Sequence, residues 1–175
     1  MNWRPHRITG RVFELSHLDP FEFELVVPEK QGKPSATYRI RVEFSMHCFT
    51  HSVRDGESYS SVLEYRHGNE TRVFDEERYD LSKLLPEIVR TISDRKCYHA
   101  KDRNFFTIEA INQDGKRSEY SVFFTVFRRG TKNGLMLVVQ SAYVRYQVPL
   151  ARRRPIRFSI IAFNVISGKP IRIPK

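Results

Sequence analysis

Two histidines on one expected strand are the first residues whose spacing could support chemistry. The segment from Tyr38 to Phe49 alternates apolar and polar residues, which is typical of a strand with one buried face. Continued to His51, this alternation places His47 and His51 on the polar face. Such a pair can cleave RNA without a metal, because one group takes the 2′-hydroxyl proton and another protonates the leaving oxygen. An ordinary solvated strand face is the alternative interpretation.

A second candidate lies near the end of a strand expected over residues 135–146. There Ser141, Tyr143 and Arg145 share one face. An arginine at this place could hold a phosphate by paired hydrogen bonds, and a tyrosine could stack on a base or donate its hydroxyl. The alternative is an amphipathic strand end whose tyrosine packs over the sheet. The candidate catalytic residues of the two strands are His47, His51, Tyr143 and Arg145.

Zinc ligand types are present, but their spacing argues against a metal site. Suitable nitrogen and sulfur atoms occur in His47, Cys48, His51, Cys97 and His99. A regular strand would point Cys48 away from the two nearby histidines, and neither cysteine has a Cys-x-x-Cys neighbour. Glycine-rich phosphate loops, His-Glu-x-x-His and Gly-x-Ser-x-Gly are all missing from the sequence. We therefore expect no metal and no cofactor.

Charge is distributed unevenly along the chain. Residues 1–95 hold 14 Lys+Arg and 16 Asp+Glu, whereas residues 96–175 hold 16 and 4, so the second part carries +12. This asymmetry favours a phosphate-bearing partner, since neutralising phosphates releases condensed counterions. The alternatives are solubility alone, or an anionic membrane surface or acidic protein as the partner. The cations expected to bind nucleic acid are interleaved with aromatic residues: Lys101, Arg103, Arg128, Arg129, Lys132, Arg152, Arg153 and Arg154.

The sequence pattern predicts the elements that position these groups, and together they form an α+β fold with mainly antiparallel strands. The 175 residues contain no repeat or low-complexity linker, so we expect a single domain over 1–175, with N-terminal strands in 1–79 and a helix plus a basic antiparallel sheet in 80–175. The expected N-terminal strands are Arg7 to Leu15, Phe21 to Val27, Tyr38 to Phe49 and Ser61 to His67.

One central helix is expected over about residues 82–95, where leucine, isoleucine and valine follow helical spacing. Pro86 falls in its first turn if Ser82 is the N-cap. The turn dipeptides Asp114-Gly115 and Asn133-Gly134 then predict hairpins within a four-stranded antiparallel meander. Its expected strands are Asn104 to Ile111, Glu119 to Phe127, Leu135 to Tyr146 and Arg157 to Ile166.

The expected location is the cytoplasm. The sequence has no secretory signal at its N-terminus and no apolar run of the roughly 18 residues that would suggest a membrane span. Its two cysteines, Cys48 and Cys97, do not describe a disulfide scaffold and fit a reducing compartment.

The order of one helix and then four strands with basic loops, over roughly Asp80 to Ser167, resembles the barnase, EndoU, colicin and RelE group of small bacterial ribonucleases, many of which are toxins. The run from Leu137 to Arg145, followed by Arg157-Phe158 and Gly168-Lys169-Pro170-Ile171, also resembles short bacterial proteins described as stationary-phase growth adaptation proteins. By analogy, the first resemblance implies metal-independent RNA cleavage.

Three functions follow as expectations. The leading one is a growth-regulating bacterial protein that acts on RNA as a metal-independent endoribonuclease of the toxin type, with a cognate antitoxin or another protein as partner. The second is a non-catalytic RNA- or DNA-binding protein whose loop Arg152-Arg153-Arg154 contacts phosphates. The third is a protein–protein adaptor or antitoxin-like partner that uses the acidic run Asp75-Glu76-Glu77.

Overall fold

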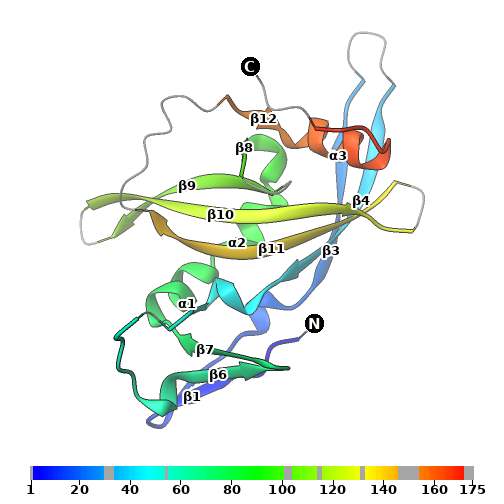
Figure 1. The fold of residues 1–175 in the computed structure, drawn as a ribbon. Coiled ribbons are helices and arrows are strands. Elements are labelled where there is room, and N and C mark those ends of the chain that lie inside the picture. The colour runs from blue at the N-terminus through cyan, green and yellow to red at the C-terminus, as the bar shows by residue number, and fades with distance from the viewer. Residues whose placement is uncertain are drawn as a thin grey trace.

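A curved mixed sheet of seven strands forms the larger part of an α+β fold in which strands predominate (Figure 1). The structure is a computed structural model that describes residues 2–29, 34–53, 55–100, 104–113, 116–130, 133–145 and 154–171. In spatial order the strands of the large sheet are β12 (Ile156–Arg157), β8 (Lys96–His99), β9 (Phe105–Gln113), β10 (Lys116–Arg128), β11 (Gly134–Arg145), β4 (Ala36–Phe44) and β3 (Phe21–Val27). The pair formed by β11 and β4 is parallel, which makes the sheet mixed.

Two small sheets lie at the lower end of the molecule in Figure 1. One has three strands, in the order β5 (Thr50–His51), β7 (Glu70–Phe74) and β6 (Glu64–His67). The other is the hairpin of β1 (His6–Ile8) and β2 (Arg11–Phe13). Its turn residues Thr9 and Gly10 have φ angles of 43° and 85°. The single strand expected over Arg7 to Leu15 is therefore wrong, because a two-residue turn divides it.

The expected central helix over 82–95 is wrong in its extent and its continuity. Two short helices, α1 (Glu76–Ser82) and α2 (Leu85–Arg90), are followed by a 3₁₀ turn, η4 (Ile92–Asp94). The first helix begins earlier because the Asp75 carboxylate accepts a hydrogen bond from the Arg78 backbone N–H at 3.0 Å. Pro86 lies in the first turn of α2, where a missing N–H costs no hydrogen bond.

The last strand of the expected meander is a helix. Only Ile156 and Arg157 form strand β12, and α3 (Phe158–Ile166) follows at once. The run from Phe158 to Ile166 is almost wholly apolar, so it has no alternation to separate a strand from a buried helix. Its buried residues Phe158, Ile161 and Ala162 follow helical spacing. The meander is thus limited to β9, β10 and β11, which are antiparallel neighbours in chain order.

One hydrophobic cluster connects the large sheet with the small ones. From α3 the Phe158 ring packs 6.1 Å from the ring of Phe124 on β10. On the other side of the cluster Phe74 of β7 contacts Tyr79 of α1, with 5.7 Å between ring centroids. Trp3 fixes the N-terminal segment to the end of β4 through a 3.1 Å hydrogen bond from its indole nitrogen to the Phe44 carbonyl. Figure 1 accordingly shows α1 between the large sheet and the small sheets.

Both cysteines are buried thiols. Burial raises the pKa of Cys48 to about 12 and that of Cys97 to about 12, which disfavours the reactive thiolate. Among the described residues, no helix has the length and apolar character needed to cross a membrane.

His17 gives the fold a defined pH dependence. Its ring lies 2.7 Å from the Ser82 hydroxyl at the end of α1, and burial together with the charge of Lys83 lowers its pKa from 6.5. The unfolded chain therefore binds a proton at higher pH than the folded chain, so His17 costs stability as the pH falls through 6.5 toward the lower folded pKa. In urea unfolding at about pH 7.5 and about pH 5.5, His17→Gln should lose less stability than the wild type. Equal losses in the two proteins would contradict this.

Candidate functional site

The two candidate histidines do not lie on one strand. Strand β4 ends at Phe44, and the 3₁₀ turn η2 (Met46–Cys48) separates it from β5. The turn forms because the Ser45 hydroxyl accepts a hydrogen bond from the His47 backbone N–H at 3.3 Å. The strand expected over Tyr38 to Phe49 is therefore too long, and alternation cannot place His47 and His51 on a shared face.

His51 is held between two carboxylates. Its Nδ1 lies 3.2 Å from Asp75 Oδ2, and its Nε2 lies 2.9 Å from Glu57 Oε1. The side chain is 15% exposed. Because both ring nitrogens have partners, His51 joins the segment before β6 to the N-terminus of α1. Neither nitrogen is available to take a proton from a substrate in this arrangement.

His47, in η2, has a different carboxylate partner, on strand β7 of the three-stranded sheet. Its Nε2 lies 2.9 Å from Glu70 Oε1, and the same oxygen is 3.2 Å from an Arg72 nitrogen. Arg72 also donates to the Thr50 hydroxyl at 2.8 Å. Burial raises the pKa of Glu70, but hydrogen bonds and charge interactions with His47 and Arg72 lower it by more, so the net pKa is lowered. Glu70 therefore stays ionised and orients His47.

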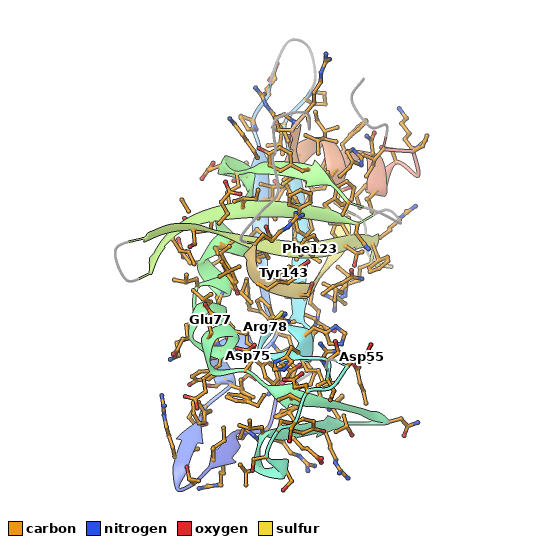
Figure 2. The ribbon with its side chains drawn as sticks, turned by 60° about the vertical axis from the view of Figure 1, so that its left-hand side comes forward. Asp55, Asp75, Glu77, Arg78, Phe123 and Tyr143 are labelled. Atoms are coloured by element: carbon orange, nitrogen blue, oxygen red, sulfur yellow. The ribbon has the colours of Figure 1, made fainter. Side chains whose placement is uncertain are left out.

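Arg78 connects α1 with the end of β11. Its guanidinium donates to the backbone carbonyls of Thr50 at 2.8 Å and His47 at 3.3 Å, and it lies 3.7 Å from Asp75. The guanidinium carbon is also 5.2 Å from the centroid of the Tyr143 ring. Figure 2 shows Arg78 and Asp75 below Tyr143, on the side of the small sheets. Burial lowers the pKa of Arg78, and the Asp75 charge opposes that shift.

Four aromatic side chains form a row across β8, β9, β10 and β11, and we call Tyr98, Phe106, Phe123 and Tyr143 the aromatic row. Successive ring centroids are 5.3, 5.4 and 5.3 Å apart, with interplanar angles of 27°, 31° and 17°. Strand register produces the row, since Tyr98 is paired with Phe106 and Phe106 with Phe123. Phe106 is fully buried and the other three rings are half-buried.

Arg145 lies over the aromatic row. Its guanidinium carbon is 5.8 Å from the Phe106 ring centroid and 6.0 Å from that of Phe123. In the part of the chain that the structure describes, no carboxylate is within ion-pair distance of Arg145. Beside Phe123 on β10, the Ser121 hydroxyl is buried and has no hydrogen-bond partner among the described residues. A cation without an ion pair and a row of rings therefore share one face of the sheet, and the exposed Glu119, which is paired with Arg145 across β10 and β11, stands beside them.

Comparison with known proteins identifies the family. The pattern that describes the YjaZ family matches residues 5–166. This chain belongs to the YjaZ family. Among its relatives is protein YjaZ of Escherichia coli (strain K12), which is 30% identical over 179 residues, covering 98% of this chain and 95% of the relative. No solved structure matches the chain.

YjaZ membership overturns both resemblances drawn from the sequence. The chain is not a member of the barnase, EndoU, colicin and RelE group, and the similarity to stationary-phase growth adaptation proteins is replaced by the YjaZ assignment. The ribonuclease resemblance relied on one helix followed by four strands. Its helix is in fact two short helices, and its last strand is α3.

Of the other cations predicted for nucleic-acid binding in this YjaZ-family chain, the structure places Arg128 and Arg129 away from Arg145. Arg128 pairs with Leu135 at the opposite end of the β10–β11 ladder from Tyr143, and Arg129 forms a 2.6 Å ion pair with Glu22. Arg154 is exposed just before β12. The remaining ones lie outside the described residues: Lys101, Arg103, Lys132, Arg152 and Arg153.

No group of three or more histidine, cysteine, aspartate or glutamate side chains within the described ranges is arranged to hold a metal ion. Cys48 donates to the Val139 carbonyl at 3.7 Å and is fully buried, whereas His47 and His51 are partly exposed.

Of the four candidate catalytic residues, the structure brings Tyr143 and Arg145 together over Phe123. Sequence reasoning missed Phe123 and Arg78, whose places depend on strand register and on a long-range contact.

Proposed function

We propose that this protein binds single-stranded RNA in the cytoplasm, on the sheet face that carries the aromatic row and Arg145. The observation that carries the proposal is the position of Arg145, whose charge lies over the rings and which forms no ion pair among the described residues. A guanidinium of this kind can form paired hydrogen bonds with a phosphate. The half-buried rings beside it offer π surface to unstacked bases.

The charge of the surrounding chain supports an anionic ligand. Residues 120–175 contain 11 Lys+Arg and no Asp or Glu. Their strand β11 and the β10 residues from Tyr120 onward contribute half of the aromatic row and Arg145. This segment has no carboxylate of its own, so an approaching phosphate backbone meets a like charge beside Arg145 only from Glu119, the residue just before the segment. Acidic residues are abundant on α1, which lies between the small sheets and the Tyr143 end of the aromatic row.

Geometry favours binding over cleavage. Metal-independent cleavage requires a group that can take the 2′-hydroxyl proton. His51 has carboxylates on both ring nitrogens, and His47 is bound to Glu70 on the small sheet. The endoribonuclease hypothesis therefore stays a prediction outside this proposal, as does the protein–protein adaptor hypothesis.

The test is to incubate the purified protein with labelled single-stranded RNA in excess chelator and to analyse the mixture on native and denaturing gels. We expect a shifted band on the native gel and intact RNA on the denaturing gel. The variant Tyr143→Ala should reduce the shift, because it removes a ring at the end of the row and the hydroxyl on it. RNA that is neither shifted nor cut would refute the proposal, and metal-independent cutting that is lost in His47→Ala would restore the ribonuclease hypothesis.

A further inference from the structure

A cavity of about 760 Å³ lies beside β10, away from the aromatic row's Tyr143 end. Its walls come from the ends of β8 and β9, from residues 125–127 of β10, from Gln140 of β11, and from the end of α3 and the chain that follows it. Pairing between β9 and β10 ends at Phe105 and Phe124, whereas β10 continues to Arg128. The cavity therefore occupies the place where, among the described residues, β9 no longer accompanies β10. Its volume is in the range of small-molecule sites.

The lining combines flat apolar walls with neutral hydrogen-bonding groups. Phe127 supplies an accessible aromatic ring that is 52% exposed, whereas Phe105 lines the wall as a buried ring that is 3% exposed. Amide side chains come from Asn104, Gln140 and Asn164. Each amide offers both donors and an acceptor, so together they can match a ligand edge that alternates the two.

The charged side chain that the structure describes in the cavity wall is a cation. Lys169 lines it, and none of its described lining residues is a carboxylate. The Lys169 ammonium lies 5.3 Å from the Phe163 ring, on the exposed side of α3. A ligand with a negative group near Lys169 therefore meets a cation and no opposing anion.

One lining residue carries a polar atom without a partner. Thr125 is 7% exposed, and its Oγ1 has no hydrogen-bond partner in the described part of the chain. A buried hydroxyl without a hydrogen bond is costly, by about 1–3 kcal/mol. Thr125 lines the cavity, but its Oγ1 is closed to solvent, so its side chain would have to rotate before a bound molecule could supply the missing partner.

We infer that this cavity binds a nucleotide. The base packs against Phe127, the amides of Asn104, Gln140 and Asn164 hydrogen-bond its edge, and Lys169 binds the phosphate. Carboxamides and aromatic rings are the groups that proteins use to read unstacked bases. This site is separate from the face proposed for RNA and does not depend on it. The nucleotide is either a free mononucleotide or the terminal residue of a strand, and both share this chemistry.

The test is calorimetric titration of the full-length protein with adenosine and guanosine 5′-monophosphate. At least one should bind with a saturable isotherm, and Asn164→Asp should weaken that binding at least about tenfold by placing a carboxylate in a site that has none. Lys169→Gln should weaken it by a similar factor. Asn69→Asp, which makes the same change on the exposed turn between β6 and β7, should leave it unchanged.

A parallel titration with an RNA oligonucleotide separates this inference from the proposed function. If Asn164→Asp weakens mononucleotide binding but leaves binding of an RNA oligonucleotide intact, the cavity takes a free nucleotide; equal weakening of both means that it takes the end of a strand. Arg145→Gln should not change mononucleotide binding. The inference is overturned if neither mononucleotide binds, or if Asn164→Asp and Asn69→Asp bind equally well.

Discussion

Replacing Arg145 by glutamine is expected to weaken binding of single-stranded RNA by about 10- to 100-fold, since a hydrogen bond to a charged group contributes about 1.5–3 kcal/mol. The change removes the cation that lies over Phe106 and Phe123. It should also make the salt dependence of binding shallower, by about 0.7 in the slope of log affinity against log salt for each phosphate that is no longer neutralised. Fluorescence anisotropy of a labelled oligonucleotide measures both effects.

Arg66→Gln is the matched control for this experiment. Arg66 lies on β6, is 71% exposed and pairs with Glu64, so its replacement removes the same charge far along the chain from the proposed face. We expect RNA affinity to change by less than about twofold, because a distant exposed charge is screened. Equal weakening in the two variants would show that only net charge matters and that Arg145 has no special role.

Arg78→Met should destabilise the protein by about 2–4 kcal/mol, because it leaves partly buried hydrogen-bond acceptors without their donor. Arg78 donates to the carbonyls of Thr50 and His47 and lies beside Asp75, and its side chain is 21% exposed. Tyr143 would also no longer pack against the guanidinium. Urea unfolding should therefore show a clearly lower midpoint for this variant.

Arg11→Gln is a suitable comparison, since Arg11 also pairs with a carboxylate of α1. Its ion pair with Glu76 joins side chains that are 63% and 51% exposed. Exposed pairs contribute little to stability, about 0–1 kcal/mol. An Arg78→Met midpoint as high as that of Arg11→Gln would mean that Arg78 does not hold α1 to the sheet.

Strands with clean alternation could be predicted from the sequence. The expected strand Phe21 to Val27 is confirmed as β3 with the same bounds. Elements without such a pattern were predicted wrongly: α3 as a strand, and α1 and α2 as one helix. The apolar run of α3 fits a buried strand or a helix equally well. The helical spacing of leucine, isoleucine and valine from Leu81 to Ile92 continues across the break between α1 and α2.

Strand alternation also made part of the candidate site predictable. Tyr143 and Arg145 are two residues apart on a regular strand end, so alternation was enough to place them on one face. Alternation failed for His47 and His51, because Ser45 starts a 3₁₀ turn between them. The parallel pairing of β4 with β11 and the contact of Arg78 with Tyr143 join segments far apart in sequence, and no local pattern encodes them.

The proposed function depends most on whether the protein binds RNA through charge. Its most direct test is an anisotropy titration of the wild-type protein with a labelled single-stranded RNA at several salt concentrations between about 50 and about 200 mM. We predict saturable binding that weakens with salt, with a slope of log affinity against log salt of about −2 or steeper, as about three neutralised phosphates would give. No binding at the lowest salt, or an affinity that does not change with salt, would contradict the proposed function.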